Sequence, residues 1–292
     1  RFKVDAEGRV CQYVYDDSGN VLRTIEYAGA ITASASYSTS YLQAQITAKG
    51  LAALAETRVT RAVYDGANRR VFSIDAMNGV TAYAYDANGN VVKTTEYATP
   101  FATAGDQSVS AMTAWAATTN IANNADNRVT RAVYDAANRV VYTVDAERYV
   151  TEQQYDKVGN LTARFRYPDQ YNVSDAEATA ANMPAKIGAP SLPPAITRMV
   201  YDAARRLMFS IGPTGSVIGY SYDANGNQLR QTQYAAAYSG GTTYTLSEAT
   251  AWASGQSAAA NAVSRSVYDA ANRLTYGIDA AGGLTPHGHD RL

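Results

Sequence analysis

The chain has 292 residues, a formal net charge of −1 and one cysteine. This length can bury a sizeable core, and the balanced charge gives no indication of a nucleic-acid partner. The single Cys11 excludes a disulfide framework, and we expect it to be an inert, buried hydrophobe. No apolar run approaches the roughly 20 residues that span a bilayer, and no secretory leader is recognisable. The chain opens at Arg1 without an initiator Met, so we expect a piece of a longer protein.

The dipeptide Tyr-Asp recurs along the whole chain. It begins at Tyr15, Tyr64, Tyr85, Tyr134, Tyr155, Tyr201, Tyr222 and Tyr268. Three of the steps (64 to 85, 134 to 155 and 201 to 222) are 21 residues, and a further 21 from Tyr268 reaches His289-Asp290, a degenerate copy. The pairs recur at longer steps of 70, 67 and 67 residues (64 to 134, 134 to 201 and 201 to 268). Such periodicity is typical of a repeat architecture.

The two periods divide the chain into blocks of about 67 to 70 residues. We expect a single repeat array over 1–292, with blocks at about 1–60, 61–130, 131–197, 198–264 and a partial block at 265–292. Because each 21-residue unit supplies two strands and a tight turn, the product is a meandering antiparallel sheet. The predicted fold class is therefore mainly β, a strip of repeated hairpins.

Residues 80–97 show how one unit forms a hairpin. Tyr83 and Tyr85 alternate on one strand, and Val91, Lys93 and Thr95 alternate on the returning strand. The intervening sequence Asp-Ala-Asn-Gly-Asn suits a tight turn, since an Asp side chain can accept backbone N–H groups two residues further on.

The fourth residue after each Tyr is expected to have a positive φ, because Gly and Asn enter this conformation most cheaply. Seven of the eight copies have Gly or Asn there, and Arg205 departs. We therefore interpret the motif residues as structural rather than catalytic. They are Tyr15, Asp16, Gly19, Tyr64, Asp65, Asn68, Tyr85, Asp86, Gly89, Tyr134, Asp135, Asn138, Tyr155, Asp156, Gly159, Tyr201, Asp202, Tyr222, Asp223, Gly226, Tyr268, Asp269 and Asn272.

A second turn joins the hairpins within each pair. It begins at Asp5, Asp75, Asp145, Gly212 and Asp279, and four of these five turns carry Gly late in the turn. Tyr149 replaces that Gly in the turn at Asp145, which predicts a wider loop there.

Inserts rich in Ala, Ser and Thr follow every second unit, at about 35–58, 104–127, 173–196 and 239–262. We expect one short amphipathic helix in each. Leu42, Ile46, Leu51 and Leu54 have helical spacing, and Ser174 with Glu177 forms a capping-box pattern.

Trp115 and Trp252 occupy one phase of the repeat, each 30 residues after a motif Tyr, and are the predicted anchors of their inserts. The low content of Lys and Glu predicts helices covered on more than one side. Pro184 in the third insert predicts a short helix.

The repeated units resemble the YD repeats of the Rhs family. The patterns YDxxGNVxxxxxYA and VYDAANRVxxxxDAxG carry this resemblance, which covers everything except the inserts. The family includes Rhs polymorphic toxins, the B and C components of Tc toxins, and teneurins. The resemblance implies a β-sheet strip that spirals into a hollow shell, which in the toxins encloses a C-terminal effector.

This chain departs from the family pattern in two ways. A helical insert follows every second unit, whereas family members string their units together with few regular interruptions. The sequence also has no signature of the core that closes the shell and cleaves itself, and no effector. Shell closure and autoproteolysis are therefore carried over to no residue of this chain.

The remaining chemical candidates are weak. His287, His289 and Asp290 could offer imidazole and carboxylate to a metal, but they fall in register with the Tyr-Asp repeat. We expect no metal, no cofactor and no enzymatic activity.

The sequence favours a non-catalytic architectural module of a shell, in a secreted or cell-surface bacterial protein. Its expected partner is the remainder of its own chain, namely a shell core and an enclosed effector. The alternative is a surface adhesin or fibre that binds glycans or other cells through Tyr-rich faces. In either case the open sheet edges of a fragment favour self-association.

Overall fold

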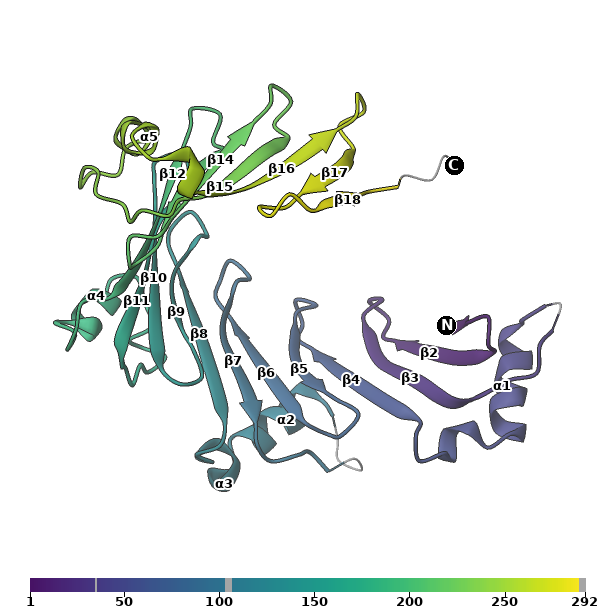
Figure 1. Cartoon of the computed structure of the whole chain (residues 1–292). Helices are drawn as coiled ribbons and strands as arrows, with labels where there is room; N and C mark the ends of the chain where they lie inside the picture. Colours follow the sequence, from purple (N-terminus) through teal and green to yellow (C-terminus); the bar gives the residue numbers. More distant parts are fainter. Residues whose placement is uncertain (35, 103–106, 289–292) are drawn as a thin grey trace. The chain divides into compact units, whose positions relative to one another are not determined.

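The computed structural model describes residues 1–34, 36–102 and 107–288, and the protein is mainly β (Figure 1). The described residues form 18 strands and five α-helices. Consecutive strands pair in antiparallel fashion, joined by turns or inserts. The predicted fold class, a strip of antiparallel hairpins with a short helical insert in each block, is confirmed. None of the helices in the described part of the chain is long and apolar enough to cross a membrane.

The strands have the lengths expected of hairpins, mostly five to seven residues, with longer strands at β3 and β11. They are β1 (Phe2–Val4), β2 (Arg9–Tyr15), β3 (Val21–Ala30), β4 (Arg58–Tyr64), β5 (Arg70–Ile74), β6 (Val80–Tyr85), β7 (Val91–Tyr97), β8 (Arg128–Tyr134), β9 (Val140–Val144), β10 (Tyr149–Tyr155), β11 (Leu161–Gln170), β12 (Ala195–Tyr201), β13 (Leu207–Ile211), β14 (Val217–Tyr222), β15 (Gln228–Gln233), β16 (Ala262–Tyr268), β17 (Leu274–Ile278) and β18 (Leu284–Pro286).

The α-helices all lie in the inserts. They are α1 (Thr39–Ala48), α2 (Val109–Ala116), α3 (Thr119–Ala122), α4 (Met183–Ile187) and α5 (Leu246–Ser254), with short 3-10 turns at Leu51–Ala53 and Ala258–Ala260.

The chain divides into two compact units. The first comprises Arg1–Arg139 with Val144–Arg148, and the second comprises Val140–Thr143 with Tyr149–Leu292. In the first unit, strands β1 to β8 pair each with the next. In the second unit, strands β10 to β18 do the same.

The connections alternate between the two ends of the strands. The Tyr-Asp turns join β2 to β3, β4 to β5 and β6 to β7. They therefore lie at the same end of the strands, along one long side of the strip. The second turns and the inserts lie along the opposite edge. There three of the four inserts begin beside a second turn, since the N–H groups of Ile31, Phe101 and Tyr238 donate to the carbonyls of Gly8, Asn78 and Gly215 at 2.8 to 2.9 Å.

Three of the four inserts each cover a small core of strand residues. In the first block, Leu42 and Ile46 of α1 pack with Val10, Tyr27 and Ile31. Equivalent clusters gather Met112 of α2 with Phe72 and Val80, and Trp252 of α5 with Phe209 and Val217. The core is thus distributed along the strip, with separate clusters beneath α1, α2 and α5, as expected of a repeat protein.

The helices are covered on one side only, contrary to the prediction from their low charge. In α1 only Leu42 and Ile46 are buried, and in α2 only Met112. Ala, Ser and Thr on the other faces are exposed to solvent. Leu54, which the periodicity placed with this apolar set, is exposed, because the helix ends at Ala48 and a 3-10 turn follows.

The capping-box pattern at Ser174 and Glu177 forms its hydrogen bonds but starts no α-helix. The Ser174 N–H donates to Glu177 Oε2 at 2.7 Å, and the Glu177 N–H donates to Ser174 Oγ at 3.3 Å. The helix α4 begins only at Met183. Pro184 explains this, because it has no N–H to donate and is tolerated only in the first turn of a helix.

Candidate functional site

The Tyr-Asp turns are the most regular feature of the molecule, and each is a five-residue loop beginning at the Asp. In the turn at Asp65, the Asn68 N–H donates to the Asp65 carbonyl at 3.0 Å, and the Asp65 N–H donates to the Arg69 carbonyl at 2.9 Å. A residue with positive φ follows the tight turn, and the strand register shifts at Tyr64. This combination is a type I turn with a glycine-type bulge.

All eight turns place their fourth residue at positive φ. The values are 86° at Gly19, 59° at Asn68, 86° at Gly89, 57° at Asn138, 92° at Gly159, 63° at Arg205, 89° at Gly226 and 58° at Asn272. Arg205 therefore departs from the residue preference but not from the conformation. Its Nε donates to Asn160 Oδ1 at 3.3 Å, a contact that anchors this less favourable residue.

The Asp side chain holds each turn together. In the turn at Asp65, Oδ1 accepts the N–H groups of Ala67 and Arg69, both at 2.9 Å. The second oxygen accepts the side chain of the fifth turn residue, Arg69 Nε, at 2.8 Å. These hydrogen bonds favour the charged carboxylate and hold the pKa of Asp65 below its ordinary value.

The fifth turn residue alternates strictly between Asn and Arg, a signal that our sequence analysis missed. Asn20, Asn90, Asn160 and Asn227 follow a Gly at the positive-φ position, whereas Arg69, Arg139, Arg206 and Arg273 follow Asn or Arg there. All eight donate a side-chain N–H to the turn Asp at 2.7 to 2.9 Å. The alternation was visible in the sequence, but its meaning depends on this contact.

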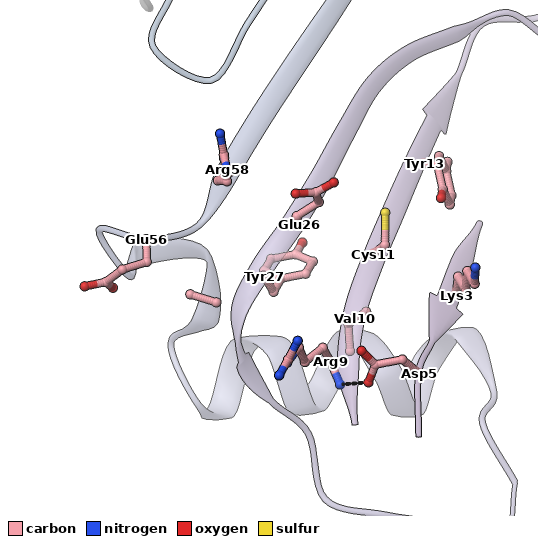
Figure 2. A pocket seen from close by; sticks show the side chains of 11 residues that line it. Lys3, Asp5, Arg9, Val10, Cys11, Tyr13, Glu26, Tyr27, Glu56 and Arg58 are labelled. Carbon is pink, nitrogen blue, oxygen red and sulfur yellow. Dashed lines mark hydrogen bonds between the residues drawn. The ribbon is translucent and has the colours of Figure 1, made fainter. Parts of the chain in front are cut away.

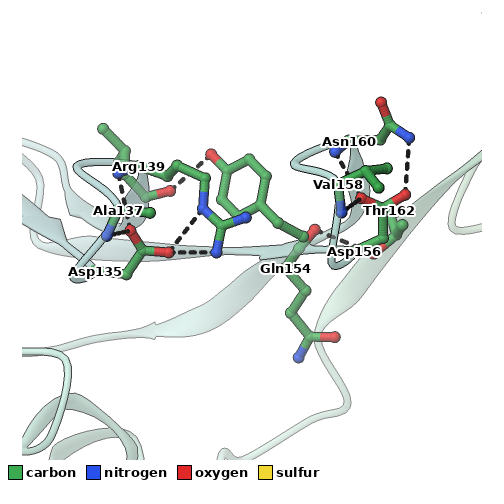
Figure 3. Close-up of polar contacts among 10 residues, drawn as sticks. Asp135, Ala137, Arg139, Gln154, Asp156, Val158, Asn160 and Thr162 are labelled. Atoms are coloured by element: carbon green, nitrogen blue, oxygen red, sulfur yellow. Dashed lines mark hydrogen bonds and ion pairs between the residues drawn. The ribbon is translucent and has the colours of Figure 1, made fainter. Parts of the chain in front are cut away.

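Figure 3 shows the two types of turn. In the turn at Asp135, the Arg139 guanidinium donates to the carboxylate through Nε at 2.8 Å and through Nη2 at 2.6 Å. In the turn at Asp156, the Asn160 side chain makes the single equivalent hydrogen bond at 2.8 Å.

Side chains also connect one turn to the next along the edge. Asn20 Nδ2 donates to Asn68 Oδ1 at 2.9 Å. The same contact recurs from Asn90 to Asn138 at 2.9 Å and from Asn227 to Asn272 at 2.8 Å. In the same direction along the chain, Arg69 Nη1 and Arg206 Nη1 donate to the backbone carbonyls of Asp86 and Asp223 at 3.4 and 3.0 Å. We call this set of contacts the turn ladder.

Several motif tyrosines donate their hydroxyl to a backbone carbonyl of the neighbouring hairpin. Tyr85, Tyr155 and Tyr222 donate to the carbonyls of Arg70, Val140 and Leu207 at 2.7 to 2.9 Å. These carbonyls belong to the residues that follow the preceding turn. The hydroxyl, which Phe would lack, explains the preference for Tyr at this position.

The second turns have the same backbone geometry, including the turn at Asp145. Gly8, Asn78, Arg148, Gly215 and Gly282 have φ of 78°, 65°, 70°, 81° and 89°. The Arg148 N–H donates to the Asp145 carbonyl at 2.9 Å, as in the other four turns. The expected wider loop at Tyr149 is therefore wrong, because Arg148 itself takes the left-handed conformation and the loop keeps its length.

Trp115 and Trp252 both lie against tyrosines of the sheet. The ring centroid of Trp115 is 5.2 Å from that of Tyr97, and the centroid of Trp252 is 5.1 Å from that of Tyr234. Both pairs meet edge to face. Trp252 is buried, whereas Trp115 is only half-buried. That both residues anchor their inserts stays a prediction.

The Tyr beneath each insert has one of two partners. Tyr97 and Tyr234 pack against Trp115 and Trp252, and Val80 lies opposite Tyr97 in the sheet. In the other two blocks, the hydroxyls of Tyr27 and Tyr167 instead donate to Gln12 Oε1 and Glu152 Oε2, both at 2.6 Å. Burial, with the nearby Glu152 carboxylate, raises the pKa of Tyr167.

A hollow of about 660 Å³ lies on the first strands (Figure 2). Lys3, Cys11, Glu26 and Arg58 occupy successive register positions across β1 to β4 and line it. Cys11 is only half-buried there, not the buried hydrophobe we expected. The lining mixes both signs of charge, so it defines no single ligand chemistry.

Of the three weak metal candidates, His287 is the one that lies within the described residues. His287 follows β18, and its N–H donates to the Thr275 carbonyl at 2.8 Å. His289 and Asp290 lie outside the described residues. Within the described part of the chain, no group of three or more His, Cys, Asp or Glu residues could hold a metal ion.

No family model matches the chain, and no curated protein matches it. Among solved structures, a crystal structure of TcdB2-TccC3 matches 95% of this chain with a TM-score of 0.53 and 11% identity. This likeness shows that the chain shares the fold of the matched part of that structure. The chain spans only 12% of the length of that protein. The Tc holotoxin pore of Photorhabdus luminescens matches 94% of the chain, with a TM-score of 0.41, 16% identity and 12% of that protein covered.

Proposed function

We propose that this Rhs-like chain is a non-catalytic architectural module, a stretch of wall in the encapsulating shell of a secreted bacterial toxin of Rhs type. The observation that carries the proposal is the turn ladder. Eight turns share one geometry, and side chains tie successive turns together within each unit. Such contacts stiffen a strip and can be extended by adding further blocks.

The distributed core supports the same role. The first, second and fourth inserts each bury their own cluster of strand residues, so stability depends on neighbouring blocks rather than on one central core. In the turns, each Asp carboxylate accepts hydrogen bonds from the backbone and from the Asn or Arg side chain of its own turn. A carboxylate that accepts two backbone N–H groups and a guanidinium is arranged to hold a loop, not to exchange protons with a substrate.

The proposed partner is the remainder of the protein's own chain, a shell core and an enclosed polypeptide. Electron microscopy of the longer protein that contains this sequence tests the proposal. We expect a closed hollow body with density inside, and an empty body of the same shape when the region following the repeats is deleted. An extended rod with one repeat per block would overturn the shell and favour an adhesin or fibre.

A further inference from the structure

A pair of like charges recurs on the sheet face that carries the helices. Arg230 of β15 lies directly opposite Arg265 of β16, and Arg23 of β3 lies directly opposite Arg61 of β4. Lys93 and Arg131 share the same register in the second block, whereas Ala163 stands opposite Arg198 in the third. The second member of the pair is thus Arg in all four blocks.

Such pairs are unfavourable in the sheet by itself. Side chains directly opposite each other on antiparallel strands have Cβ atoms about 5 Å apart, and like charges there destabilise the pairing. Burial and the neighbouring Arg23 guanidinium lower the pKa of Arg61. Across the residues that the structure describes, Arg23, Arg61, Arg230 and Arg265 form no ion pair with a carboxylate.

The pair in the fourth block adjoins a hollow of about 380 Å³ between β13 to β15 and the segment of α5. Arg230 lines this hollow with Ser221, Thr232, Ser254, Gln256 and Asn261. Tyr234, which packs against Trp252, forms part of its wall. No Asp or Glu is among the lining residues, so the hollow offers a guanidinium, hydroxyls and amides and has no counter-charge of its own.

We propose that the hollow beside Arg230 and Arg265 is a binding site for a carboxylate side chain of an acidic polypeptide segment. A guanidinium binds a carboxylate through two parallel hydrogen bonds, and a second guanidinium across the strand pair adds its charge. The hydroxyl and amide groups of the lining match the N–H and C=O groups of a peptide backbone.

Binding of a labelled, capped, glutamate-rich peptide to the 292-residue chain tests the site, with a glutamine-rich peptide of the same length as the reference. We expect Arg230→Gln and Arg265→Gln each to weaken the affinity for the acidic peptide by about tenfold. The matched control is Arg58→Gln, which removes the same charge from an exposed position in the other unit. The affinity of the Arg58→Gln variant for the acidic peptide should stay within about twofold of that of the unaltered chain.

Thermal unfolding without peptide gives a second, independent readout. Because each substitution removes a like-charge contact, Arg230→Gln and Arg265→Gln should raise the Tm. A lowered Tm would mean that these arginines stabilise the fold and would overturn the proposal.

Two outcomes of the binding experiment would also overturn the proposal. One is an equal loss of binding in Arg58→Gln, and the other is tighter binding of a single-stranded DNA oligonucleotide of matched charge. The site does not depend on the shell proposal, since an acidic segment could bind in a rod as well as in a closed body.

Discussion

Asn20 donates its side-chain amide to the side-chain carbonyl of Asn68, 48 residues further along the chain, at 2.9 Å. Asn20 also holds Asp16 of its own turn, and Asn68 is the residue of the next turn that has positive φ. One amide therefore joins two turns that belong to different blocks. This contact makes the turn row a connected structure rather than a series of separate loops.

The turn ladder should contribute measurably to stability. Asn138 Oδ1 accepts hydrogen bonds from Asn88 at 3.0 Å and Asn90 at 2.9 Å. Replacing Asn138 with Gly keeps the left-handed backbone and removes only these contacts, so we expect a loss of about 1 kcal/mol in the free energy of unfolding. Asn138→Ala should lose about 1 kcal/mol more, because Ala also disfavours positive φ. Denaturant unfolding measures both. Equal stability of Asn138→Gly and the unaltered chain would show that the ladder is not stabilising.

Gly89 is required because of its positive φ, and not because a side chain there would clash with a neighbour. Its φ is +86°, and a Cβ built there meets no atom within 4 Å. Gly89→Val should therefore lower the free energy of unfolding by about 1 to 3 kcal/mol, from backbone strain alone. Gly66 is the matched control, since it lies in the preceding turn, has equally open surroundings and lacks the positive φ. Gly66→Val should stay within about 0.5 kcal/mol. Similar losses in both variants would contradict the turn assignment.

Gly219 and Gly277 test the alternating packing beneath the inserts. A Cβ at Gly219 would lie 3.0 Å from the Tyr234 ring and 3.2 Å from the Phe209 ring, whereas a Cβ at Gly277 would lie 3.6 Å from its nearest neighbour. Neither glycine has positive φ. Gly219→Ala should therefore cost about 1 to 3 kcal/mol through overpacking. Gly277→Ala should be neutral or stabilising by up to about 1 kcal/mol, since Ala restricts the unfolded chain. The two Tm values should move in opposite directions or differ clearly in size.

Stability should fall in acid because of the turn carboxylates. Hydrogen bonds hold the pKa of Asp86 and its seven equivalents below the ordinary value. A pKa that is lower in the folded than in the unfolded state stabilises the protein above the unfolded value, about 3.9, and this contribution is lost as the pH falls through the folded pKa. The Tm should be nearly constant from about pH 7 to 5 and drop below about pH 4.

The variant Asp86→Asn separates this effect from general acid denaturation. It should have a lower Tm at neutral pH, and its Tm should fall less between neutral pH and acid than that of the unaltered chain. Asp17→Asn, at an exposed position of another turn, serves as the control. A Tm that falls in parallel for Asp86→Asn and the unaltered chain would mean that the turn carboxylates do not set the acid limit.

The sequence by itself determined the features that depend on neighbouring residues. The alternation of strand residues, the Asp at the start of each turn and the Gly or Asn at its fourth position are local requirements of side-chain period and backbone φ. They predicted the hairpins, the antiparallel strip and the helical inserts. Arg205 and Arg148 show the limit of predicting backbone conformation from residue type. The surrounding hairpin holds even Arg in the left-handed conformation at these two positions.

Only the tertiary structure decided the features that join residues far apart in the chain. The contacts of Asn20 with Asn68, the alternative partners of Tyr27 and Tyr97, and the opposed pair Arg230 and Arg265 all depend on strand register. A shift of one residue would turn each of these side chains to the other face. Likewise, the start of α4 at Met183 was decided by competition between a local capping pattern and Pro184. Register and competition of this kind are set by the packing of whole strands and helices, so the sequence pattern could not supply them.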